Sequence, residues 1–267
     1  MAVARSMVAL VVGLACAIAT TSPAIAGEGR ADGASPGSRT PVTAPEGSPA
    51  ANPAAAQVGA TPLPACAIGD RLTADRGYGA WATSILDWQL RLPSGYAPRD
   101  LRSTASAGIA GGRVRALVLP DLQALVRAGI ADGVRLAIQS SYRSYATQAH
   151  TFAYWVGASS WRTAVASSAR AGHSEHQLGT VLDFRSAGGP APWNLTDWAR
   201  TKAGAWMAAN GWRYGFVMSY PKGESAATCY QYEPWHYRYV GRDLAAQVHE
   251  AGLTLREFLW ARAQAAD

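Results

Sequence analysis

Lysine is almost absent from this chain of 267 residues, which contains only Lys202 and Lys222. Arginine therefore supplies nearly all of the positive charge, and the formal net charge is +6 at pH 7. The sequence has no cluster of basic residues with interleaved aromatics, and this absence argues against nucleic-acid binding. A modest positive charge suits an anionic partner, but it is equally typical of an ordinary solvated surface.

Long apolar runs are also missing. The one apolar stretch, over 7–19, is too short to span a bilayer as a stable anchor. A basic residue precedes it, and Ala24-Ile25-Ala26 follows with the small-residue pattern of a signal-peptidase site. The sequence predicts a signal peptide over 1–26 and a secreted mature protein without a membrane span. Lipoprotein processing at Cys16 is the alternative, but Gly13 stands where that signal prefers a large aliphatic residue.

Aromatic residues are absent from 27–64, where Gly, Ala, Ser, Pro and Thr dominate. Such a segment cannot bury enough apolar surface to offset the entropy lost on ordering, so we expect a flexible, disordered linker. The remaining residues, 65–267, are numerous enough for one hydrophobic core. We expect them to form a single monomeric domain.

Cysteine occurs three times, and one of the three is removed with the signal peptide. Cys66 and Cys229 remain, and two cysteines in an exported chain are more often bridged than free. We therefore predict a Cys66–Cys229 disulfide, with two unrelated buried thiols as the alternative.

Hydrophobic periodicity predicts helices interleaved with short strands. The expected helices are one after Pro120 that ends before Gly133 and others over 145–156, 160–171, 197–209, 241–250 and after a Thr254/Glu257 capping box. The expected strands cover 134–139, 180–184, 212–217 and 235–240. Because the order lacks a βαβ rhythm, the pattern indicates an α+β domain with a small antiparallel sheet flanked by helices.

Histidine occurs only five times, and two of the five stand beside other metal-binding side chains. His176 and Asp183 share the segment 174–183, and the segment Glu233-Pro234-Trp235-His236 supplies the second histidine. Two histidines and one carboxylate leave a fourth zinc coordination position open to water. Glu233 is then the carboxylate that takes a proton from that water without binding the metal.

The spacing of these residues favours convergence from different elements. Gly179 interrupts any helix that would carry both His176 and Asp183, so we expect His176 in a turn and Asp183 on the strand over 180–184. His236 would approach from a neighbouring strand. Taken singly, each of these side chains could instead be a satisfied structural polar group.

Both segments resemble the signatures of the VanY-type zinc D-alanyl-D-alanine carboxypeptidases. Residues 174–183 are similar to Ser-x-His-x-x-Gly-x-Ala-x-Asp, and Glu-Pro-Trp-His followed by Tyr237-Arg238-Tyr239-Val240-Gly241 is similar to the second signature. The resemblance covers most of 137–241. Val181 stands where the family usually has Ala, and we expect its two extra methyl groups to narrow the pocket and alter substrate preference.

A third segment, Ser141-Tyr142-Arg143-Ser144-Tyr145 with Gln148, is also similar to the family. The resemblance implies that Arg143 reaches the active site, where a guanidinium suits the substrate carboxylate or the developing oxyanion. The alternative is a helix-start arginine that bonds nearby carbonyls. Ser174 resembles the family serine that contacts substrate, and Gln148 is a further substrate-binding candidate. Trp235 is expected to form a pocket wall beside His236.

The resemblance implies a secreted zinc hydrolase that removes the terminal D-alanine from peptidoglycan stem peptides. In this hypothesis His176, Asp183 and His236 bind zinc, Glu233 is the base, and Arg143 stabilises the oxyanion. An L,D-carboxypeptidase or a peptidoglycan endopeptidase on the same scaffold is the nearest alternative. A non-catalytic wall-binding module is another, although such a module has no need for a base.

The other tryptophans and histidines are expected to be structural. We predict that the tryptophans other than Trp235 lie mostly in the core: Trp155, Trp161, Trp193, Trp198, Trp206 and Trp212. His173 adjoins the first segment, but in an extended chain it would point away from His176, so we expect it to be exposed or to act only indirectly.

Overall fold

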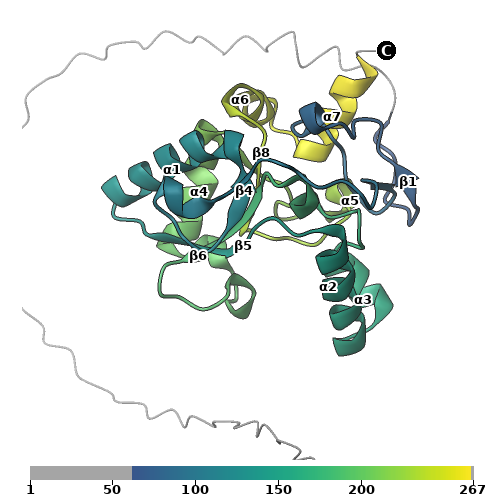
Figure 1. Cartoon of the computed structure of the whole chain (residues 1–267), viewed down its shortest axis with the longest axis horizontal. Helices are drawn as coiled ribbons and strands as arrows, with labels where there is room; N and C mark the ends of the chain where they lie inside the picture. The colour runs from purple at the N-terminus through teal and green to yellow at the C-terminus, as the bar shows by residue number, and fades with distance from the viewer. Residues whose placement is uncertain (1–61, 266–267) are drawn as a thin grey trace, which may run out of the picture. The chain divides into compact units, whose positions relative to one another are not determined.

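The computed structural model describes residues 62–265 (Figure 1). The predicted signal peptide over 1–26 and all but the last three residues of the predicted linker lie outside this range. Within the described residues, no helix is both long and apolar enough to cross a bilayer.

A four-stranded antiparallel sheet lies at the centre, as the sequence predicted, with the strand order β5-β6-β8-β7. Its strands are β5 (Leu136–Ser140), β6 (Val181–Ser186), β7 (Phe216–Met218) and β8 (His236–Tyr239). Two small pairs accompany it: parallel β1 (Arg71–Leu72) with β2 (Leu90–Arg91), and antiparallel β3 (Leu101–Ser103) with β4 (Arg113–Arg115).

Seven α-helices occur among the described residues, and they fall into three groups (Figure 1). α1 (Leu119–Ala131) and α4 (Lys202–Asn210) pack on the sheet, and α2 (Tyr145–Ala158) pairs with α3 (Trp161–Ser167). The rest are α5 (Ser225–Thr228), α6 (Arg242–Ala251) and α7 (Leu255–Gln264). Short 3-10 helices connect them: η2 (Tyr78–Ala80), η3 (Thr104–Ala107), η4 (Ala116–Val118), η5 (Glu175–Leu178), η6 (Pro192–Asn194), η7 (Trp198–Arg200) and η8 (Gly211–Tyr214).

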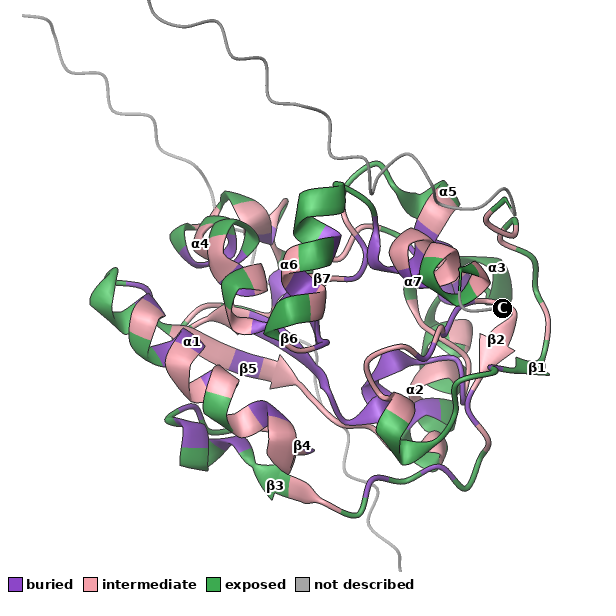
Figure 2. Ribbon diagram, turned by 90° about the horizontal axis from the view of Figure 1, so that it is seen from above, coloured by how far each residue is buried: buried purple, intermediate pink, exposed green. Residues whose placement is uncertain are grey.

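The main core lies on one face of the sheet. Leu182 and Phe184 of β6 are fully buried and pack in one cluster with Leu122 of α1 and Met207 of α4. Figure 2 shows buried positions along β6 and on α1 and α4. Since successive side chains of a strand point to opposite faces, Asp183 points away from this cluster. The core therefore fixes the strand that presents Asp183 on the other face of the sheet.

The structure corrects three predicted boundaries. The strand predicted over 212–217 is wrong in its first half, because η8 occupies that part and Gly215, at φ 84°, turns the chain into β7. The helix predicted over 197–209 is divided at Thr201, whose side chain caps α4. α3 ends at Ser167, earlier than predicted, whereas the Thr254/Glu257 capping box of α7 is confirmed.

The predicted Cys66–Cys229 disulfide is present and attaches the start of the domain to the loop before Glu233. Arg256 reinforces this attachment from α7. Its guanidinium donates to the Asp87 carboxylate at 2.8 Å, to the Ala227 carbonyl at 2.8 Å and to the Pro64 carbonyl at 3.0 Å. Together these contacts hold the N-terminal segment, residues 62–92, and Ala227 of α5 against α7.

Candidate metal and catalytic site

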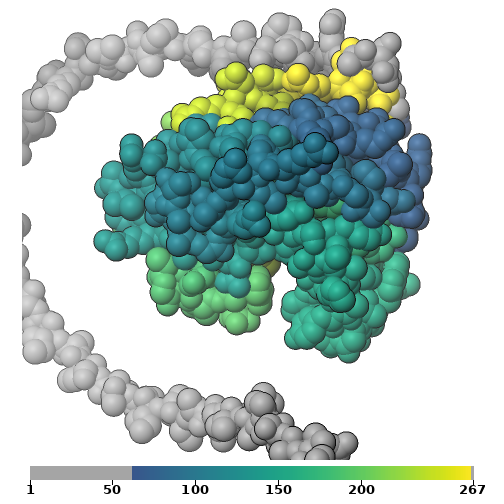
Figure 3. Space-filling view, viewed as in Figure 1, coloured from purple at the N-terminus to yellow at the C-terminus, as the bar shows by residue number. Residues whose placement is uncertain are grey.

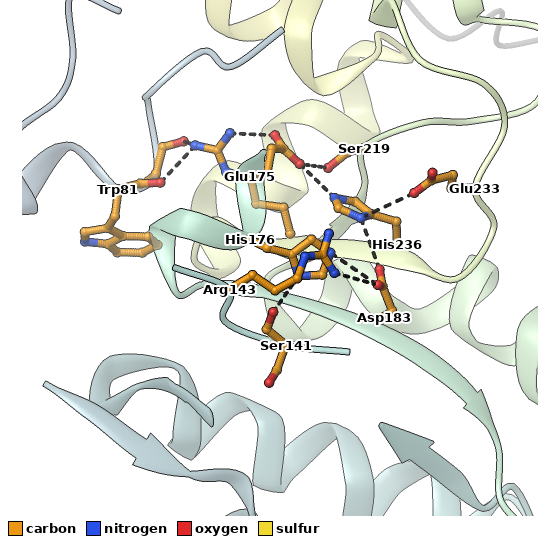
Figure 4. Close-up of polar contacts among 11 residues, drawn as sticks. Trp81, Ser141, Arg143, Glu175, His176, Asp183, Ser219, Glu233 and His236 are labelled. Atoms are coloured by element: carbon orange, nitrogen blue, oxygen red, sulfur yellow. Dashed lines mark hydrogen bonds and ion pairs between the residues drawn. The ribbon is translucent and has the colours of Figure 1, made fainter. Parts of the chain in front are cut away.

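Three predicted metal ligands converge from three elements (Figure 4). Asp183 of β6 and His236 of β8 are directly paired in the sheet, and His176 comes from η5. η5 ends at Leu178, and the following Gly179, whose φ of 74° suits glycine, lets the chain turn into β6. All three residues are buried, and one potential ligand atom from each lies within 4.8 Å of the other two.

Hydrogen bonds settle which imidazole nitrogens face the shared carboxylate. His176 Nδ1 donates to the Ser141 carbonyl at 2.7 Å, which leaves Nε2 facing Asp183 Oδ2 at 3.2 Å. His236 Nε2 faces Glu175 Oε2 at 3.1 Å, and its Nδ1 faces Asp183 Oδ1 at 3.1 Å. Each ring is thus held on one side and presents its other nitrogen to Asp183, the arrangement typical of oriented metal ligands.

Glu233 lies beside the donor group, which consists of the three potential metal ligands His176, Asp183 and His236. Its Oε2 is 3.5 Å from His236 Nδ1, and its side chain is 18% exposed. Burial raises the pKa of Glu233 to about 7, helped by the negative charge of Asp183 and opposed by His236 and Arg143. A carboxyl group that titrates near neutrality is suited to take up and release a proton.

Arg143 approaches Asp183 from the other side, immediately before α2. Its Nη1 is 3.8 Å from Asp183 Oδ2 and donates to Ser140 Oγ at 2.5 Å, and its Nε donates to Gln148 Oε1 at 2.8 Å. The Gln148 amide nitrogen donates in turn to the Ala169 carbonyl at 2.7 Å. Because both ends of this fully buried amide are bonded to protein, the structure favours Gln148 as a support for Arg143 over direct substrate contact.

One cavity of about 640 Å³ connects the predicted site residues. Its lining includes all three metal candidates together with Arg143, Ser174, Glu233 and Trp235. Two expectations about its walls fail. Val181 is fully buried and is not among the described residues that line the cavity, so it does not narrow it directly. Trp155 and Trp193, expected in the core, line the cavity and are 39% and 47% exposed.

Glu175 is a component of the site that sequence reasoning missed. Its Oε1 accepts a hydrogen bond from Arg238 Nη1 at 2.8 Å, and its Oε2 accepts one from Ser219 Oγ at 2.6 Å while facing His236. Burial alone would raise the pKa of Glu175, but Arg238, His236 and Ser219 lower it to about 2. A signal was present, because Arg238 follows His236 by two residues on one strand and so shares its face.

His173 is buried rather than exposed. Its Nδ1 is 2.7 Å from the Asp87 carbonyl, and its Nε2 is 3.4 Å from an Asp70 carboxylate oxygen. These contacts tie the N-terminal segment to the chain before η5. His173 therefore supports the position of the segment that carries His176.

Comparisons with known proteins agree with the geometry. A family model described as VanY, D-alanyl-D-alanine carboxypeptidase, matches residues 112–242. A D-alanyl-D-alanine carboxypeptidase of Enterococcus faecalis (strain ATCC 700802 / V583) is 30% identical over 188 residues, which cover 67% of this chain and 66% of that protein. The chain spans about two thirds of the length of the curated relatives it matches.

Solved structures show the same fold. The LD-carboxypeptidase LdcB aligns with a TM-score of 0.59 and 27% identity over 73% of this chain and 98% of that chain. A mutant of the vancomycin resistance D,D-pentapeptidase VanY from a VanB-type cassette, in complex with Zn(II), aligns with a TM-score of 0.57 and 29% identity over 67% of this chain and 99% of that chain. The sequence, the fold and the site agree, and the chain belongs to the VanY family of D-alanyl-D-alanine carboxypeptidases.

Proposed function

We propose that this protein is a secreted zinc D-alanyl-D-alanine carboxypeptidase that removes the terminal D-alanine from peptidoglycan stem peptides. The observation that carries the proposal is the position of Glu233, which lies 3.5 Å from His236 but outside the donor group. A binding module would need neither this half-buried carboxyl group nor a cavity that joins it to Arg143.

The donor chemistry fits zinc. Two imidazole nitrogens and one carboxylate oxygen are the ligand types of catalytic zinc sites, which leave a position for water or substrate. The VanY structure in complex with Zn(II) supports the same ion for His176, Asp183 and His236. When bound, zinc supplies Lewis acidity to the attacked carbonyl and lowers the pKa of the attacking water.

The chain's own residues account for the proton transfers. Glu233 accepts a proton from the attacking water and returns it to the nitrogen of the departing D-alanine. In the metal-free chain burial raises the pKa of Glu233 to about 7, and a zinc ion bound nearby would lower it toward the ionised form that a base requires. Arg143 faces the same cavity with its guanidinium already oriented by Ser140 and Gln148, so it can bind the terminal carboxylate or the oxyanion without reorganising.

A second candidate is an L,D-carboxypeptidase, because LdcB shares the fold over 98% of its chain. A digest of purified muropeptides with the zinc-loaded protein distinguishes the two. Release of D-alanine from pentapeptides, with tetrapeptides left intact, is the expected result. Release from tetrapeptides alone would establish the L,D activity instead, and cleavage at a cross-bridge would make the protein an endopeptidase.

Trimming the terminal residue removes the donor bond needed for cross-linking, so the proposed role is wall maturation or remodelling. Secretion rests on the predicted signal peptide over 1–26. Mass spectrometry of the mature N-terminus tests this part of the proposal, with Gly27 as the expected first residue.

A further inference from the structure

A second cavity lies at the edge of the central sheet, along β7. It has a volume of about 210 Å³ and is bounded by α4, β7 and α6. In Figure 3, α6 and α7 form the yellow-green and yellow band along one edge of the domain. Tyr237 of β8 lines this cavity, whereas His236 lines the catalytic one. Because neighbouring side chains of a strand point to opposite faces, Tyr237 points away from the donor group.

The lining of this edge cavity is apolar, and it contains no Asp, Glu, Lys or Arg among the described residues. It includes Met207 and Met218, the two methionines of residues 62–265. Methionine is flexible and polarizable, so it adapts to irregular partners and is frequent at binding surfaces. Trp212 and Phe216 add aromatic surface. Such a lining fits a neutral, mainly apolar occupant, because it offers no ionised group to pair with a charge.

The hydroxyl of Tyr237 is an unsatisfied polar group in this setting. Tyr237 is only 2% exposed, and its hydroxyl oxygen is buried without a hydrogen-bond partner among the described residues. Other buried polar atoms of the described residues also lack a partner, but only this one belongs to a residue that lines the edge cavity. A buried donor left unpaired costs its desolvation free energy without return. An occupant that accepts a hydrogen bond from Tyr237 would recover that loss.

The volume of the edge cavity limits the size of its occupant. A dry apolar cavity of roughly 150 Å³ holds one benzene molecule. The edge cavity, at about 210 Å³, therefore has room for one ring with a short substituent. Ligand sites in proteins typically combine such apolar walls with a few polar groups that fix the orientation of the ligand.

We propose that the edge cavity binds a small neutral molecule, about one ring in size, that presents a single hydrogen-bond acceptor such as a ketone carbonyl to the Tyr237 hydroxyl. The apolar body of the ligand packs against Met207, Met218 and Phe216. The site is separate from the catalytic cavity, because the two share no lining residue. Since Tyr237 follows His236 on β8, the ligand packs on the strand that carries a proposed metal ligand.

A matched pair of probes tests the acceptor. Acetophenone and α-methylstyrene have nearly the same shape, but only the ketone can accept a hydrogen bond through an oxygen. In NMR titrations of the purified protein, acetophenone should bind about fivefold or more tighter than α-methylstyrene, as expected for one buried hydrogen bond. Benzoate has a similar size but carries a charge, so it should bind more weakly than either neutral probe.

Two substitutions separate the hydroxyl from the cavity. Tyr237→Phe removes the hydroxyl and keeps the ring, so the preference for acetophenone should disappear while α-methylstyrene still binds. Ala208→Leu on α4 enlarges an exposed side chain of the cavity wall and should weaken binding of both neutral probes. Ala205→Leu is the matched control, because Ala205 is exposed on the same helix but is not among the lining residues, and it should leave both affinities unchanged.

The outcomes that would overturn the site are distinct. A ketone preference that survives Tyr237→Phe would place the acceptor elsewhere, and tightest binding by benzoate would contradict the neutral lining. Equal affinities of the unsubstituted protein for the two neutral probes would mean that a water molecule satisfies the hydroxyl. Absence of binding by both neutral probes would show that the edge cavity takes no such ligand. None of these results depends on peptidase activity, so the proposed function is tested separately.

Discussion

Glu175 and Glu233 approach the imidazole of His236 from opposite sides, and the pKa values of their carboxyl groups are shifted in opposite directions. Glu175 faces Nε2 and accepts hydrogen bonds from Arg238 and Ser219, and its pKa is lowered to about 2. Glu233 faces Nδ1 at 3.5 Å, and burial raises its pKa to about 7. Burial disfavours the charged form of both carboxyl groups, so the difference comes from the donors each one finds.

The difference separates two roles on one histidine. Glu175 is a fixed acceptor that orients His236, and Arg238 extends this contact to the Trp81 and Ala82 carbonyls of the N-terminal segment at 2.8 and 3.1 Å. Glu233 lacks such strong partners and can change its protonation state. Substituting the two glutamates should therefore give distinguishable results.

The largest expected effect is on turnover by Glu233→Gln. Removing a general base without removing a metal ligand should lower kcat by roughly 10²- to 10⁴-fold. Zinc content should stay near one ion per chain, as determined by metal analysis. Near-normal turnover with zinc retained would show that Glu233 is not the base.

His176→Ala, Asp183→Ala and His236→Ala should instead lower the zinc content itself, because each removes one of three protein ligands. Metal analysis after dialysis measures this loss, and circular dichroism checks that each variant is folded. Full occupancy in all three variants would remove the proposed site.

Glu175→Gln should act on the metal more than on the chemistry. Losing the carboxylate that orients a metal-binding histidine typically lowers metal affinity by about 10- to 100-fold. Competition with a chelator measures the zinc affinity independently of turnover. Ser219→Ala provides a milder test, because it removes one neutral donor to the same oxygen and leaves the Arg238 ion pair intact. Unchanged zinc affinity in both folded variants would contradict an orienting role.

Substituting Glu175 and substituting Glu233 should change the stability of the zinc-free protein in opposite directions. The pKa of Glu175 is below its ordinary 4.5, so its stabilisation is complete above pH 4.5 and is lost as the pH falls toward 2. The pKa of Glu233 is above 4.5, so its ionisation penalises the folded state increasingly from pH 4.5 to 7. At pH 8 Glu175→Gln should therefore lower the melting temperature, and Glu233→Gln should raise it.

Thermal unfolding at pH 4 supplies the control for this comparison. There Glu233 is mostly protonated in both states, so its substitution should change stability little. If both variants shifted the melting temperature in the same direction at pH 8, the two carboxyl groups would not differ in their effect on stability as proposed.

The sequence predicted the donor group well because its geometry follows from local rules. Gly179 marks the turn after His176, and the strand pattern around Asp183 alternates with core residues whose burial fixes its face. His236 then follows from the pairing of two short strands. The antiparallel sheet and the disulfide were predicted for similar reasons of pattern and pairing.

The sequence could not show what depends on three-dimensional neighbours. The amide of Gln148 is a chemical group that could bind substrate, but it is hydrogen-bonded to Arg143 and to the Ala169 carbonyl. Trp193 looks like a core residue until the open cavity beside it is known. The position of Arg238 two residues after His236 indicated a buried arginine beside the site, but its partner Glu175 is 63 residues away in the sequence and was missed.

The most direct test of the central claim compares a peptide ending in free D-Ala-D-Ala with the same peptide amidated at its C-terminus, both treated with the zinc-loaded protein. Mass spectrometry of the products measures release of the last residue. The account predicts release of D-alanine from the free peptide and little or no cleavage of the amidated one, because Arg143 is the proposed partner of the terminal carboxylate. Equal cleavage of both peptides would contradict the carboxypeptidase assignment and favour an endopeptidase.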